Sequence, residues 1–325
     1  MTLHRAAAAV LIALLLAGAG GSDAAAQDFA GKPMRMIVGL APGGGTDATA
    51  RLIAQRLSVS LGANVYVENK PGGAFAPAYR ELVNAEPDGR TLFFISTSTV
   101  VAQPSQQDYP FDVRKMTAVT EVGRGPFILT ARNALGFHNV GDLIAYAKGN
   151  PGKLTFGSGG GATGSFSLSA ELLRLAAGIA IVNVPYKGSS EALSDLLGGR
   201  VDAMFDATPI EIPQVKAGAV TGIAVTGRKR LAALPEVGTF AESGFEDFDV
   251  GNYYGILAPP GTPAAVAQKL RDQVAIAVAA PEVIELFDQQ GMTPTASEPA
   301  DFARMLAADL SRWSDVIAKA GVALR

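Results

Sequence analysis

Hydrophobic positions along the chain follow two periods, one typical of strands and one typical of helices, and the two alternate. Short apolar runs at 34–40 and 91–95 fit buried strands, whereas Ile53, Leu57 and Leu61 recur four residues apart, as on one face of an amphipathic helix. Strands that alternate with helices indicate a parallel sheet. Ligands of open parallel sheets bind beyond the carboxyl ends of the strands.

The same patterns predict the remaining elements. Strands are expected at 64–68, 119–131, 154–156, 181–185, 201–205 and 255–258, and helices at 47–61, 77–85, 143–148, 264–279, 282–289 and 299–320. Two more helices are expected, one that includes 168–176 and one that follows Ser190 and ends at Gly198-Gly199. The run at 119–131 suits a segment that crosses between two domains, and 223–226 suits the return.

Two glycine-rich loops stand directly between a strand and a helix, one in each half of the chain. They are Gly39–Asp47 and Gly157–Ser165. Backbone N–H groups at a helix start have no intrahelical partner, so they favour a carboxylate or phosphate, and glycine lets that ligand approach closely. One such loop alone is an ordinary linker. The pair predicts two anion-holding turns that face each other and close on one acidic ligand.

The length of the chain predicts two domains. With 325 residues we expect residues 27–122 and 227–325 to form the first domain and residues 123–226 to form the second. At the N-terminus, His4 and Arg5 precede a short apolar stretch, and Ala24–Ala26 fits a cleavage site. These features predict a removable signal peptide at 1–26 and export to the periplasm, with an uncleaved anchor as the alternative.

Composition excludes several kinds of function. The net charge is −3 and basic residues form no run, which argues against nucleic acid as a partner. The chain has no cysteine and only two histidines, His4 and His138, so thiol chemistry is absent and a histidine cluster for a metal is too. We assign His138 no role and expect no metal and no cofactor.

Several motifs in series resemble those of a known family. They are Ala41–Asp47, Val67–Gly72, Pro87–Gly89, Val184–Gly188, Asp195–Asp202 and Ala258–Pro263. They look like the Bug (TctC-like) family of periplasmic solute receptors of tripartite tricarboxylate transporters. The resemblance implies an α/β protein with the type II periplasmic binding protein fold, two doubly wound domains joined by two crossovers with a ligand cleft between them. It also implies a carboxylate ligand and membrane permease subunits as partners; we expect a monomer.

The resemblance also implies ligand-binding positions on both loops. They are Ala41, Pro42, Gly43, Gly44 and Asp47 in the first loop and Ser158, Gly159, Gly160, Gly161, Ala162 and Thr163 in the second. Asp47 either accepts a hydrogen bond from the ligand or caps the helix, and both roles are compatible. Tyr186 and Asp206 resemble positions that face the cleft from the second domain, although Tyr186 equally suits packing.

The chain departs from the family at three places. Phe75 replaces a small residue and either narrows the pocket or turns into the core; Tyr253 stands where the family often has Trp; and Ser167-Leu168 stands where it commonly has His-Leu. Discrimination among ligands is expected to depend on Phe75, Asp206, Tyr253 and the hydroxyls that include Ser96 and Thr97.

The leading hypothesis is a non-catalytic receptor that captures a dicarboxylate, an amino acid or an aromatic acid for a tripartite tricarboxylate transporter. One alternative is a receptor that presents its ligand to a membrane sensor kinase. Another is an exported hydrolase with Ser158 as nucleophile. The hydrolase fits poorly, because Phe156 occupies the first glycine position of a nucleophile elbow and no histidine is placed to act as base.

Overall fold

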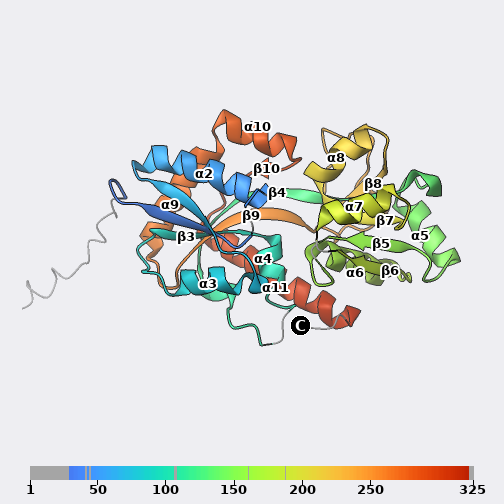
Figure 1. Ribbon diagram of the computed structural model, residues 1–325, viewed down its shortest axis with the longest axis horizontal. Coiled ribbons are helices and arrows are strands. Elements are labelled where there is room, and N and C mark those ends of the chain that lie inside the picture. Colours follow the sequence, from blue (N-terminus) through green and yellow to red (C-terminus); the bar gives the residue numbers. More distant parts are fainter. Residues whose placement is uncertain are drawn as a thin grey trace, which may run out of the picture.

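The protein folds into two α/β lobes joined by long strands (Figure 1). The computed structural model describes residues 29–40, 42–43, 45–105, 108–159, 161–186 and 188–321. The predicted signal peptide at 1–26 lies outside these residues. Within the described part, no helix is long and apolar enough to cross a membrane.

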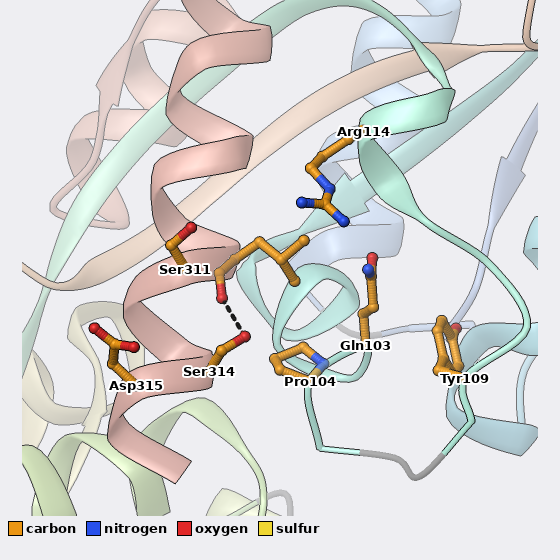
Figure 2. Close-up of a pocket in the computed structure, with 8 residues that line it drawn as sticks. Gln103, Pro104, Tyr109, Arg114, Ser311, Ser314 and Asp315 are labelled. Atoms are coloured by element: carbon orange, nitrogen blue, oxygen red, sulfur yellow. Dashed lines mark hydrogen bonds between the residues drawn. The ribbon is translucent and has the colours of Figure 1, made fainter. Parts of the chain in front are cut away.

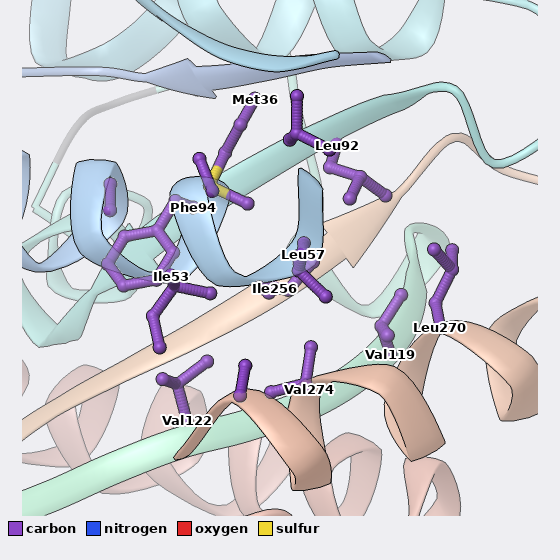
Figure 3. Packing of buried hydrophobic residues seen from close by; sticks show 14 of the residues in the cluster. Met36, Ile53, Leu57, Leu92, Phe94, Val119, Val122, Ile256, Leu270 and Val274 are labelled. Atoms are coloured by element: carbon purple, nitrogen blue, oxygen red, sulfur yellow. The ribbon is translucent and has the colours of Figure 1, made fainter. Parts of the chain in front are cut away.

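The first lobe is built from both ends of the chain. Its elements are β1 (Met34–Val38), α2 (Gly45–Leu61), β2 (Val65–Asn69), α3 (Ala76–Val83), β3 (Thr91–Ser96), α4 (Thr97–Val101), α9 (Ala264–Val278), α10 (Pro281–Gln289) and β10 (Thr293–Pro294). Figure 3 shows Ile53 and Leu57 of α2 packed near Phe94 and Val274. The apolar face predicted for this helix is therefore the face that covers the sheet.

The second lobe repeats the alternation. Its elements are α5 (Val140–Gly149), β5 (Thr155–Ser158), α6 (Ser165–Ala177), β6 (Val182–Pro185), α7 (Ser189–Leu197), β7 (Ala203–Ala207), α8 (Thr208–Lys216) and β8 (Thr221–Val225). Its core contains stacked aromatic rings, with the Phe240 and Phe248 centroids 4.3 Å apart and Phe205 beside them.

Two strands and one helix connect the lobes. β4 (Thr117–Ala131) pairs with β9 (Gly251–Ala258) in the first lobe and with β7 and β8 in the second. The order of strands is β2-β1-β3-β9-β4-β7-β5-β6, with β8 and β10 also on β4. Helix α11 (Pro299–Ala320) buries Leu306 in the first core and Trp313 in the second, so it ties the lobes together along one side.

Strand direction places the ends of the parallel strands at the junction of the lobes. In the second lobe β7 runs antiparallel to β4 and ends with Ala207 opposite Phe127, and β5 is parallel to β7. In the first lobe β3 ends with Ser96 opposite Tyr254 of β9, and β1 is parallel to β3. Both glycine-rich loops follow such strand ends, so both leave their sheets toward the opposite lobe.

The return to the first lobe differs from the expectation. Residues 223–226 were expected to cross back, but they belong to β8 and its end, which pair with β4 inside the second lobe. Phe240, Phe245 and Phe248 still pack on the second core, and the strand that crosses is β9. Apolarity alone does not distinguish the two strands, because both are buried.

Candidate functional site

The first glycine-rich loop is fixed by Asp47. This residue is 4% exposed, and its Oδ2 accepts hydrogen bonds from Gly43 N and Arg51 Nε, both at 3.0 Å. Its Oδ1 accepts another from Asn69 Nδ2 at 2.9 Å. Burial by itself raises the pKa of Asp47, but hydrogen bonds from Arg51, Gly43 and Asn69 outweigh it and lower the pKa below the usual value.

Asp47 therefore holds the turn that leads into α2. With both oxygens bonded inside the protein, its carboxylate holds the loop in the conformation that starts α2. Gly43 has φ +92°, which favours glycine, and Pro42 beside it is exposed. Ala41 and Gly44 of the predicted set lie outside the described residues.

The second glycine-rich loop lies tightly against the start of α7. A Cβ on Gly159 would lie 2.6 Å from the backbone N of Ser189, so a side chain has no room there. Gly161, with φ +83°, donates its N–H to the Tyr186 carbonyl at 2.8 Å. Its own carbonyl accepts from Ser167 Oγ at 2.8 Å. Ala162 and Thr163 are half-buried beside it, and Gly160 lies outside the described residues.

Ser158 lies at the end of β5, fully buried, and its Oγ donates to Asn183 Oδ1 at 2.7 Å. An amide oxygen is not a general base. This geometry fits a serine that braces two neighbouring strands and does not fit an activated nucleophile. Ser167, at the position where the family resemblance suggests histidine, is likewise used to hold the loop.

Tyr186 and Asp206 occupy different environments in the second lobe. The Tyr186 hydroxyl donates to Asp195 Oδ2 at 2.6 Å, and burial together with that carboxylate raises its pKa to about 12. The structure thus supports the packing role for Tyr186. Asp206 is fully buried at the end of β7; its Oδ1 accepts from Ser189 Oγ at 2.8 Å and from Ala207 N at 2.7 Å, while its Oδ2 has no partner.

Ser96 and Thr97 lie at the carboxyl end of β3, on the junction side. The Ser96 Oγ lies 2.9 Å from Ser98 Oγ, and Ser96 N donates to Thr99 Oγ1, so these hydroxyls begin α4. Thr97 Oγ1 donates to the Gly251 carbonyl and accepts from Tyr253 N, each at 3.0 Å. These hydroxyls fasten the end of β3 to the crossing strand β9.

The aromatic residues predicted for the site are largely packed in the first lobe. Tyr253 is 5% exposed and belongs to the core beneath α11. Phe75 is half-buried against the same core, and its Cδ1 would lie 2.6 Å from a Cβ on Gly39, the first residue of the first loop. Phe75 (φ 69°) and Ala74 (φ 48°) both have left-handed backbones, which side chains disfavour. The Phe75 ring thus forms part of the base of the first loop.

Two cavities lie away from the glycine-rich loops. One of about 410 Å³ separates α11 from the segment around Arg114, with Ser311 and Asp315 on the helix side (Figure 2). The other, of about 930 Å³, lies along β4 and β9 at the lobe junction and includes Tyr253 among its lining residues. Among the described residues, no cluster of three or more acidic or histidine side chains is placed to hold a metal ion.

One buried acid near the site was not anticipated. Glu211, in the first turn of α8, is fully buried, and neither carboxyl oxygen has a hydrogen-bond partner. The sequence carried a signal for it, since an acid flanked by Ile210 and Ile212 is unusual on an exposed segment.

Curated relatives match almost the whole chain. It is 36% identical to a UPF0065 protein of Agrobacterium vitis, over 92% of this chain and 87% of that protein. It is 32% identical to BugT of Bordetella pertussis, over 97% of this chain and 98% of that protein.

Solved structures agree with this likeness. The periplasmic binding protein BugD is 31% identical, with a TM-score of 0.74 over 90% of this chain and 98% of that one. MatC of Rhodopseudomonas palustris with bound malate is 27% identical, with a TM-score of 0.74 over 88% and 99%. A second R. palustris protein, solved with adipate, is 30% identical, with a TM-score of 0.77 over 91% and 99%.

The two-lobed fold, the paired loops and these relatives agree with one family model, the tripartite tricarboxylate transporter family receptor, which matches residues 49–322. The chain belongs to that family, the TctC-type solute-binding receptors, which includes the Bug proteins.

Proposed function

We propose that this protein captures a small organic carboxylate between its lobes and delivers it to the membrane subunits of a tripartite tricarboxylate transporter. The observation that carries the proposal is the convergence of two glycine-rich loops on the lobe junction, each before a long helix, α2 and α6. The first N–H groups of a helix have no intrahelical partner, so a helix start on each lobe suits a ligand with a carboxylate at each end.

A dicarboxylate is the ligand class best supported. Structural relatives were solved with malate and with adipate, which share two carboxylates and differ in length. In the proposed complex, the backbones at 41–44 and 159–163 hold the anionic ends. Ser96, Thr97 and Asp206 lie at strand ends that border the same junction, and they would shape the part of the site that selects the rest of the ligand. Phe75 and Tyr253 would act by packing, and Tyr186 by supporting the second loop.

Capture requires no chemistry. A ligand that contacts both lobes stabilises the closed arrangement, and micromolar affinity, about −8 kcal/mol, is reasonable for such a site. The family consists of receptors, and Ser158 is bonded to an amide, which together support a non-catalytic role. The periplasmic location of relatives and the sequence of residues 1–26 support export.

A thermal-shift panel tests the proposal. Malate, adipate, an amino acid and an aromatic acid are each compared with the corresponding neutral amide, because a ligand that binds only the folded state raises the melting temperature. We expect at least one acid, most strongly a dicarboxylate, to stabilise the protein while its amide does not. Equal stabilisation by acid and amide would remove the role of the anion-holding loops.

A further inference from the structure

The interior of the second lobe contains two buried carboxylates, and the described residues place no cation against them. Asp206 at the end of β7 and Glu211 in the first turn of α8 are both fully buried. Asp206 Oδ2 has no hydrogen-bond partner, and neither carboxyl oxygen of Glu211 makes a hydrogen bond of normal geometry, although the buried Thr130 hydroxyl lies close to them. Burying two ionised carboxylates without compensation is very unfavourable, so at least one of them must hold a proton.

Strand register puts these groups on one face of the sheet. Asp206 is opposite Ile128 of β4, and Thr130 lies two residues further along β4, so both side chains point to the same side. Helix α8 covers that side, because its Ile212 packs against Ile128 and Val225. The two acids and the hydroxyl are therefore enclosed between α8 and the sheet.

No described charge on the surrounding elements compensates the pair. The other charged groups on β4, α7 and α8 are Glu121, Arg124, Glu191, Asp195 and Lys216, and β8 carries none. The two further segments packed on α8 carry Arg228, Lys229, Arg230, Glu236 and Asp288, all of them exposed. Glu121 pairs with Arg124, Asp195 pairs with Arg200, and Lys216 is exposed at the far end of α8.

The charge state of the pair follows from burial. Burial, with the neighbouring charge of Asp206, raises the pKa of Glu211 to about 8, against the nearby Thr130 hydroxyl, which lowers it. Burial raises the pKa of Asp206 to about 6, against hydrogen bonds from Ser189 and Ala207 that lower it. Near neutral pH, Glu211 is therefore mostly protonated and Asp206 carries the single negative charge.

Helix α8 also makes a contact between the lobes. The Thr208 Oγ1 donates to the Gln290 carbonyl of the first lobe at 2.6 Å. A Cβ on Gly291 would lie 3.1 Å from Thr208 Cβ and 3.2 Å from Ile212 Cδ1, so α8 packs closely on this segment. Thr208 and Glu211 are three residues apart and share the first turn of the helix.

We propose that Glu211 is a positioning residue for ligand capture: its neutral, protonated carboxyl keeps the first turn of α8 in place, so that Thr208 contacts the first lobe and Asp206 keeps its orientation at the junction. Loss of the proton places a second negative charge beneath α8, which favours displacement of that turn and weakens the closed arrangement. The inference rests on the proposed function, and it makes capture dependent on pH.

The first test measures the dissociation constant of malate by calorimetry between about pH 6 and pH 9. For the wild type we expect affinity to fall by at least about fivefold toward the alkaline end, the lower range of an ordinary coupling between sites. Glu211→Gln, which mimics the protonated acid, should remove that dependence. Glu246→Gln is the matched control, because Glu246 is exposed on the second lobe, and it should behave as the wild type.

The second test needs no ligand and follows urea unfolding over the same range. The folded protein keeps on Glu211 a proton that the unfolded chain loses above its ordinary pKa of 4.5, so stability should fall as the pH rises toward about 8. Glu211→Gln should lack this fall. An infrared band of a protonated carboxyl in the wild type at neutral pH checks the same proton without any variant.

The outcomes separate the two claims. If unfolding depended equally on pH in the wild type and in Glu211→Gln, or if no band of a protonated carboxyl were seen, the claim that Glu211 holds a proton in the folded protein would be wrong. A buried proton with malate affinity that is independent of pH would overturn the positioning role. If neither malate nor any other carboxylate bound at any pH, the proposed function and the positioning role would fail together, and the unfolding and infrared measurements would still decide the proton.

Discussion

At the scale of single residues, the second glycine-rich loop has little freedom. Gly159 packs on the backbone of Ser189, Ser189 Oγ donates to Asp206, and Gly161 is bonded to Tyr186. A change at one of these positions therefore moves the others. These contacts with the rest of the second lobe fix the shape of the loop, and a ligand would bind on the side of the loop that faces away from them.

Gly159→Ala tests this constraint. The added Cβ would lie 2.6 Å from Ser189 N, a backbone atom that cannot rotate away. We expect a loss of about 1–3 kcal/mol in the free energy of unfolding, as for other overpacked sites. Affinity for a stabilising carboxylate should fall at least about tenfold, or about 1.4 kcal/mol. Gly149→Ala, where nothing lies within 4 Å of the new atom, should be close to neutral in urea unfolding and calorimetry.

Asp47→Ala tests the first loop. Removing the carboxylate leaves Gly43 N without its acceptor and Asn69 Nδ2 with only the Leu40 carbonyl, so we expect about 1–3 kcal/mol of destabilisation and weaker carboxylate binding. The pKa of Asp47 is lowered, so its stabilising effect is present above its ordinary pKa of 3.8 and disappears as the pH falls below it.

Asp301→Ala is the control for Asp47→Ala, because Asp301 is an exposed acid in the first turn of α11. Its loss should change stability by less than about 1 kcal/mol, as for other surface pairs. Carboxylate affinity that is unchanged in Asp47→Ala would limit Asp47 to capping the helix.

At the scale of elements, the sequence predicts best where one face is continuously apolar. The long helices α2, α9 and α11 were expected within a few residues of their bounds, because their buried faces repeat with the helical period. Helix α8 was not expected. It contains Pro209 and Pro213, and its buried face includes Glu211, so neither composition nor pattern favours a helix.

The candidate site, too, could be predicted only in part from the sequence. The two glycine-rich loops could be located from the sequence, because strand, glycines and helix are adjacent in the chain. The partners that fix them could not, because Asn69 reaches Asp47 and Ser189 reaches Asp206 only in the folded protein. The sequence pattern also could not show that the chain crosses back to the first lobe through β9, because this depends on whether Phe240 and Phe248 pack in the first or the second core.

The crossing strands give a prediction at this scale. A Cβ on Gly251 of β9 would lie 2.4 Å from the Gly125 carbonyl oxygen of β4, so Gly251→Ala must push the two strands apart where the lobes meet. We expect about 1–3 kcal/mol of destabilisation and weaker carboxylate binding. Gly227→Ala, with 3.3 Å to Pro126 Cβ, should have a smaller effect on both. The reverse order, measured by urea unfolding and calorimetry, would contradict this account of the junction.

At the scale of the whole molecule, the lobes are joined unequally around their junction. Helix α11 contributes to both cores, and β4 runs through both parts of the sheet. In contrast, among the described residues, α8 contacts the end of α10 through the hydrogen bond from Thr208 to Gln290 and close packing at Gly291. Relative motion of the lobes is therefore expected to bend β4 and β9, with the α8 contact as the part that changes.

Small-angle scattering can follow that motion. A ligand that bridges both loops favours the closed arrangement, so saturating malate should reduce the radius of gyration of the wild type, and malamide at the same concentration should not. Malate should reduce the radius of gyration of the Gly251→Ala variant less than that of the wild type, because the substitution forces β4 and β9 apart where they must bend. If malate bound tightly while the radius of gyration stayed constant, the ligand would be held by one lobe alone. The second glycine-rich loop would then have to be explained by its packing against Ser189 and not by an anion.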